Sequence, residues 1–217
     1  MAHPTQLILY NGALRLLGQP KLATITEEKE ARRILDDAWN DEARDFVLEQ
    51  GNWNFATRTI RIEIDSALTP EFGFNNAFNK PDDWVRTVTI ASDEYFLFSM
   101  TDREYNDEGD YWFSDIDQMY VKHVSNDAAY GADYALWPRT YLRLNQAYLA
   151  REINPRLKQT TKSKEDAEEV YDKALTLARS NDALNEGVKF APPGGWGTAR
   201  GGRGGRRDRG GRNSLTG

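Results

Sequence analysis

Five acidic side chains lie close together in one polar segment of the chain and could coordinate a cation. They are Asp102, Glu104, Asp107, Glu108 and Asp110. A calcium loop of the EF-hand type also needs a glycine at its sixth position and a bidentate glutamate at its twelfth, and this segment has neither. We therefore expect a loop that makes charged contacts with a neighbouring molecule rather than a metal site.

The rest of the 217-residue sequence contains none of the motifs typical of common active sites. Gly-x-Ser-x-Gly, a P-loop and His-Glu-x-x-His are all absent. Because there are no cysteines, disulfides, thiolate nucleophiles and cysteine-ligated zinc are excluded. With only two histidines, a metal centre with several histidine ligands is nearly excluded too. His123 lies in an alternating stretch that is typical of a strand face. We predict a protein that is not an enzyme and holds neither a metal ion nor a cofactor.

Glycine and arginine dominate the last twenty residues. Six arginines and one aspartate give residues 198–217 a net charge of +5, so the preceding residues carry −11 of an overall charge of −6. Together with a nearby tryptophan, these arginines are the predicted binding residues of the chain. They are Trp196, Arg200, Arg203, Arg206, Arg207, Arg209 and Arg212.

Two functions are open for this segment. In the first it is a nucleic-acid-binding arginine–glycine box, in which arginines contact phosphates and stack on bases. In the second it docks in an extended form on an acidic protein partner, anchored by Trp196 and by bidentate arginine–carboxylate pairs. The acidic remainder of the chain disfavours the first function, because a negative surface repels phosphate.

Hydrophobic periodicity predicts helices on both sides of a region rich in strands. Helical spacing covers residues 5–17, 27–50, 137–154 and a segment from Ser163 onward. The predicted strands are residues 60–64, 84–91, 94–100 and 111–124. No apolar run approaches the roughly 18 to 20 residues that span a bilayer, and no basic stretch precedes an apolar one, so we expect a soluble protein made in a cytoplasm.

This pattern predicts an α+β fold made of three parts. An antiparallel bundle of about four helices, from residues 1–55 and 134–187, carries a β-rich insertion at residues 56–133. Residues 188–217 form an extended Gly/Arg-rich C-terminal tail, because they offer almost no apolar surface to offset the entropy of ordering.

Specific residues are expected to set the ends of the helices. Gly18 stops the first helix, and Gly51 occupies the left-handed position after the second. Thr26 and Ser163 act as N-caps. Asn154–Pro155 ends the third helix, since the residue before proline avoids the helical region.

Three stretches of the sequence are similar to one family. They are LYNGALRLLGQPKLATITEEKEARRILDDAWNDEARDFVLEQGNWNFATRT (Leu9 to Thr59), FGFNNAFNKPDDWVRT (Phe72 to Thr87) and VKHVSNDAAYGADYALWP (Val121 to Pro138). Their order and spacing resemble the head-to-tail connector or adaptor proteins of tailed bacteriophages, such as the tail tubular protein A family of short-tailed phages.

The resemblance implies a structural protein of the virion, located at the head–tail interface and made in the host bacterial cytoplasm. Family members form a homo-oligomeric ring, typically a dodecamer, beneath the portal protein. They offer a platform to the next tail component, a nozzle or tail terminator, and genomic DNA passes through the lumen without specific binding. They are not enzymes and have no membrane partner. Their fold is a helical bundle with an inserted β-rich part.

Overall fold

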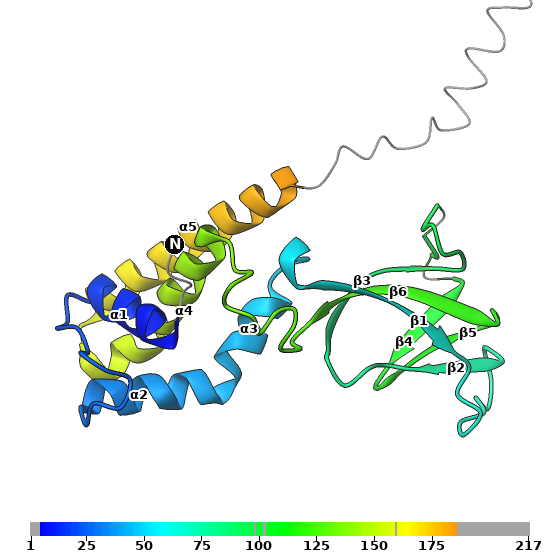
Figure 1. Ribbon diagram of the computed structural model, residues 1–217, viewed down its shortest axis with the longest axis horizontal. Helices are drawn as coiled ribbons and strands as arrows, with labels where there is room; N and C mark the ends of the chain where they lie inside the picture. The colour runs from blue at the N-terminus through cyan, green and yellow to red at the C-terminus, as the bar shows by residue number, and fades with distance from the viewer. Residues whose placement is uncertain (1–4, 98, 102, 159, 186–217) are drawn as a thin grey trace, which may run out of the picture. The chain divides into compact units, whose positions relative to one another are not determined.

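The computed structural model describes residues 5–97, 99–101, 103–158 and 160–185. Within this part of the chain it shows five α-helices and six strands in one compact unit that ends at Asn185 (Figure 1). The helices are α1 (Gln6–Leu16), α2 (Glu30–Ala38), α3 (Arg44–Glu49), α4 (Arg139–Leu157) and α5 (Thr161–Asn185). The strands are β1 (Thr57–Glu63), β2 (Asn76–Asn79), β3 (Trp84–Ala91), β4 (Tyr105–Glu108), β5 (Tyr111–Ser114) and β6 (Gln118–Ser125).

The predicted fold class is wrong in its central feature. The structure is an α+β fold with five helices and two three-stranded antiparallel sheets, not an antiparallel bundle of about four helices. The sheets have the strand orders β1-β6-β3 and β2-β5-β4. They enclose a second apolar core around Phe78 and Trp112, and the larger core combines helix residues with Val124 of β6. The sheets are therefore structural layers in their own right, because they bury apolar faces that the helices do not cover.

The predicted helix over residues 27–50 is interrupted in the structure. It begins at Glu30 after the N-cap residue Lys29, so Thr26 does not cap it. A wide π-helical turn, Trp39–Ala43, separates α2 from α3. Such turns insert one extra residue per turn and rotate the apolar stripe of a helix.

The glycine prediction holds at one position and fails at the other. Gly18 has a φ of +66° and follows α1, as expected of a left-handed stop. Gly51 is not among the glycines with positive φ. The end of α3 is closed instead by Trp53, whose indole N–H donates to the carbonyl oxygens of Val47 and Leu48 at 3.1 and 3.0 Å.

The junction of α4 and α5 also differs from the prediction. Helix α4 continues through Pro155 to Leu157 rather than ending at Asn154. Ser163 lies inside α5 rather than at its N-cap. The two residues bond to each other: the Asn154 amide donates to the Ser163 carbonyl, and the Ser163 hydroxyl donates to the Asn154 side-chain oxygen, both at 2.8 Å. This pair ties the end of one helix to the start of the next and outweighs the local preferences.

The strand predictions hold where alternation is strict. Residues 84–91 form β3, and residues 111–124 fall into β5 and β6, which are separated by a turn. The described residues of the range 94–100 do not form a strand; they have turns and one isolated bridge from Ala91 to Ser99. The carboxylate of Asp93 accepts hydrogen bonds from the backbone N–H groups of Tyr95 and Leu97, which folds the segment back on itself.

Candidate interaction surface

The predicted binding residues lie outside the described residues. Trp196 and the six arginines from Arg200 to Arg212 all fall in residues 186–217, so their role stays a prediction. The candidate surface described below therefore comes from the folded unit alone. None of the helices in the described ranges is long and apolar enough to cross a membrane.

The described part of the acidic segment, residues 103–110, contains β4 with a turn on each side. Asp107 forms an ion pair with Lys80 and also accepts a hydrogen bond from the Trp112 indole at 3.0 Å. Glu104 accepts the backbone N–H of Thr101 at 2.7 Å, and this bond lowers the pKa of its carboxyl. Hydrogen bonds within the folded unit thus hold the carboxylates of Glu104 and Asp107 in place. Over the described part of the chain, the structure shows no group of three or more His, Asp or Glu side chains arranged to hold a metal ion.

Lys80 is the buried cation of the sheet region. Its ammonium group lies 4.0 Å from the centroid of the Trp84 ring and 5.4 Å from that of Trp112, and it donates to the Gly109 carbonyl at 2.7 Å. Trp112 is a buried member of the second apolar core, and Trp84 packs against that core. Cation–π attraction and the ion pair with Asp107 together compensate for the desolvation of the lysine. Sequence analysis did not single out Lys80, because its partners are distant in the chain.

A second polar cluster, partly buried, joins three strands of the β1-β6-β3 sheet. The carboxylate of Asp83, just before β3, accepts hydrogen bonds from Arg58 of β1 at 2.9 Å and from the Ser125 hydroxyl of β6. The imidazole Nε2 of His123 lies 3.4 Å from the same carboxylate oxygen. His123 is on β6 as its alternating sequence predicts, and it is 0% exposed.

The chemistry of this cluster is structural rather than nucleophilic. Burial lowers the pKa of His123, although the hydrogen bond to Asp83 acts in the opposite direction. Because the Ser125 hydroxyl donates to Asp83, its proton is not directed at the imidazole as a serine–histidine catalytic pair requires. The His123 ring has no exposed surface from which to reach a substrate. These residues therefore fasten the sheet.

The folded unit exposes apolar side chains on several of its elements. Phe72, in the loop before β2, is 88% exposed, and Tyr95, in the loop after β3, is 74% exposed. On α5, Val170, Leu177 and Leu184 are exposed at intervals of seven residues, next to the stripe that carries the buried Tyr171 and Ala178 side chains. Exposed apolar side chains on loops and along one helix are available for contact with another protein.

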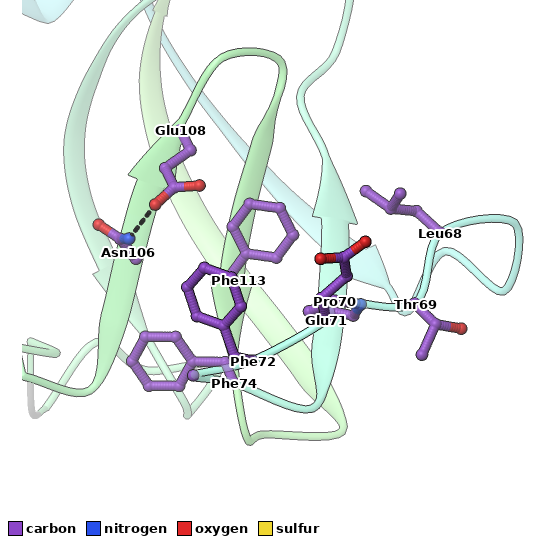
Figure 2. Close-up of a pocket in the computed structure, with 10 residues that line it drawn as sticks. Leu68, Thr69, Pro70, Glu71, Phe72, Phe74, Asn106, Glu108 and Phe113 are labelled. Carbon is purple, nitrogen blue, oxygen red and sulfur yellow. Dashed lines mark hydrogen bonds between the residues drawn. The ribbon is translucent and has the colours of Figure 1, made fainter.

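The loop that carries Phe72 forms one side of an open cavity of about 330 Å³ beside strands β4 and β5 (Figure 2). Phe72, Phe74 and Phe113 lie together in its wall. The other lining residues are Leu68, Thr69, Pro70, Glu71, Gly73, Asn106 and Glu108. The site is thus mainly apolar with two carboxylates, Glu71 and Glu108, both on exposed residues. Sequence analysis missed it, although the alternation of phenylalanine in Phe72-Gly-Phe74 after a proline was a visible signal.

Neither a comparison with protein-family models nor a search of curated proteins gives a match for this chain.

Proposed function

We propose that the chain is a structural head–tail adaptor of a tailed bacteriophage. Copies of it form a ring beneath the portal protein, connect the capsid to the tail and let genomic DNA pass. The observation that carries this proposal is the set of exposed apolar side chains on different elements of the folded unit: Phe72 and Tyr95 on loops, and Leu177 and Leu184 on α5. A closed ring requires two different lateral surfaces on each copy, so a ring subunit must expose such residues in more than one place.

Two further features support the same function. Residues 57–125 hold fourteen Asp and Glu against six Lys and Arg, a net charge of −8. A negatively charged wall does not retain DNA, because it repels the phosphate backbone. The resemblance of three long stretches of the sequence to the adaptor family supplies the partners: the portal on one side and the next tail protein on the other.

The test is a light-scattering mass of the full chain, alone and mixed with the portal protein of the same phage. We expect a discrete heavy complex in the mixture. Replacement of the six arginines between positions 200 and 212 by serine should abolish stable attachment while the circular dichroism spectrum stays unchanged.

A matched control removes the same charge elsewhere. The six exposed basic residues for this control are Arg15, Lys21, Arg33, Arg103, Lys162 and Lys164. Their replacement by serine should leave the portal complex intact. No complex with the unaltered chain, together with salt-sensitive binding of single-stranded nucleic acid, would contradict the adaptor function and favour an arginine–glycine box that binds nucleic acid.

A further inference from the structure

The cavity beside β4 and β5 combines an aromatic wall with negative charge. Phe72, Phe74 and Phe113 supply ring faces, and Glu71 and Glu108 supply carboxylates (Figure 2). Glu108 accepts a hydrogen bond from the neighbouring Asn106 amide, which leaves further lone pairs of its carboxylate open to another donor. Such a site fits a partner that brings one large apolar side chain and a positively charged group a short distance away.

We propose that this cavity binds residues 191–203 of a second copy of the chain. Trp196 fills the space between the phenylalanine rings, and Arg200 and Arg203 pair with the carboxylates of Glu71 and Glu108. This proposal rests on the proposed ring, because the ring is what brings a second copy close to the cavity.

Charge complementarity is the first argument for this occupant. The cavity belongs to a region with a net charge of −8, whereas residues 198–217 carry +5. Guanidinium groups stack on aromatic faces and form bidentate pairs with carboxylates, so arginine suits both components of the site. The segment also contains a large aromatic side chain, Trp196, close to its first arginine.

The spacing of the segment is the second argument. Residues 191–203 read APPGGWGTARGGR, with Arg200 four residues after Trp196. Four residues of extended chain span roughly 13 Å. A tryptophan seated in a cavity of about 330 Å³ therefore leaves the first arginine within reach of the acidic residues that line it. Linking an apolar anchor to charged contacts raises affinity because the second contact becomes intramolecular.

The first experiment measures binding of a fluorescein-labelled peptide of residues 191–203 by fluorescence anisotropy. The receptor is the full chain with the substitutions Trp196→Ala, Arg200→Ser and Arg203→Ser, so that its own segment does not compete. We expect saturable binding that weakens as salt is raised to about 0.5 M. The substitution Trp196→Ala in the peptide should weaken binding roughly tenfold or more, as expected for an aromatic anchor.

Variants of the receptor locate the site. Phe72→Ala should weaken binding roughly tenfold, and the double substitution Glu71→Gln and Glu108→Gln should weaken it severalfold and reduce its salt dependence. Phe72 is 88% exposed, so its loss leaves the fold intact. Tyr95→Ala is the matched control, because it removes another highly exposed aromatic, outside the cavity, and should bind the peptide as before. Absent binding, or an equal loss in the Phe72 and Tyr95 variants, would overturn the proposal.

A mixture of two full-length variants tests whether the contact joins two copies. A chain with Phe72→Ala lacks the cavity wall, and a chain with Trp196→Ala lacks the anchor. Sedimentation should show more association in the mixture than in either variant alone. A mixture that associates no more than the separate variants would overturn the contact between copies. Peptide binding without any portal complex would contradict the proposed function and support the cavity assignment. A portal complex without peptide binding would support the proposed function and overturn the cavity assignment.

Discussion

Replacement of Asp83 by alanine tests whether one carboxylate holds three strands together. Asp83 accepts hydrogen bonds through one carboxylate oxygen, Oδ2, from Arg58 on β1 and from Ser125 on β6, and its backbone carbonyl accepts the N–H of Asn126 at 3.1 Å. Because both donors meet the same oxygen, an asparagine could keep both hydrogen bonds with its amide oxygen, whereas an alanine removes the acceptor. The strands would keep their backbone ladder and lose this cross-link.

The magnitude follows from the two contacts. A hydrogen bond between charged groups contributes about 1.5–3 kcal/mol when buried, and the pair with Arg58 falls to about 1 kcal/mol because the arginine side chain is 36% exposed. The buried Ser125 hydroxyl contributes about 1 kcal/mol more. We expect the free energy of unfolding to fall by about 2 kcal/mol. For a folded unit of this size the melting temperature should fall by about 4–8 °C.

The assay is thermal and urea unfolding followed by circular dichroism near neutral pH. Asp82→Ala is the matched control, because it removes the same charged side chain from the adjacent exposed residue and should leave the melting temperature almost unchanged. Equal shifts for the two variants would refute the assignment of Asp83 as a cross-link.

The pH dependence gives an independent check. Burial raises the pKa of Asp83, but the hydrogen bonds from Ser125 and Arg58 and the nearby His123 outweigh it, so the pKa lies below its usual value. A carboxyl with a depressed pKa stabilises the fold above the unfolded-state pKa, and this contribution is lost as pH falls through the folded pKa. The difference between the wild-type chain and the variant should therefore shrink below about pH 4. A difference that is constant down to pH 2 would contradict a role for the charge.

Two further substitutions and one titration test other parts of the fold. Gly131→Ala should destabilise by about 2–3 kcal/mol in urea unfolding, because the new Cβ would lie 2.3 Å from the backbone oxygen of Ser125, which cannot move as a flexible side chain can; an unchanged midpoint would contradict this packing. Lys80→Met should lower stability by about 1–2 kcal/mol and alter tryptophan emission, since the ammonium group lies over two indole rings; unchanged emission would argue against that geometry. Burial raises the pKa of Tyr141 above that of exposed tyrosines, so ultraviolet titration should show its hydroxyl protonated until the fold is lost. The free energy of unfolding should therefore fall as pH rises above 10, where the tyrosine of the unfolded chain ionises. Ionisation of Tyr141 together with the exposed tyrosines would refute its burial.

Local patterns determined a large part of the secondary structure. The alternation around Ile60 and Ile62 predicted a strand that the structure has as Thr57–Glu63, and the glycine at position 18 predicted the end of α1. These predictions depend on neighbours in the chain. A period of two fixes which side of a strand is apolar, and a positive φ favours glycine wherever it occurs.

Contacts beyond the immediate neighbours in the chain decided the remaining features. The extension of α4 through Pro155 accompanies a hydrogen-bonded pair nine residues apart, and the end of α3 is closed by an indole rather than by glycine. Asp83 and Ser125 are 42 residues apart and meet only because β6 lies between β1 and β3. The spacing of apolar residues in the predicted helix over residues 27–50 does not indicate the π-helical turn that divides it.

The sequence by itself determined the acidic body, the arginine–glycine segment, the absence of cysteine chemistry and the alternation of helical and strand-forming stretches. Only the tertiary structure decided that the strands make two sheets with their own core, that Lys80 and Asp83 fasten them, and that Phe72, Phe74 and Phe113 line one cavity. The reason is physical: composition and periodicity report what each residue does along its own element, whereas a core or a cavity depends on which elements the topology brings together.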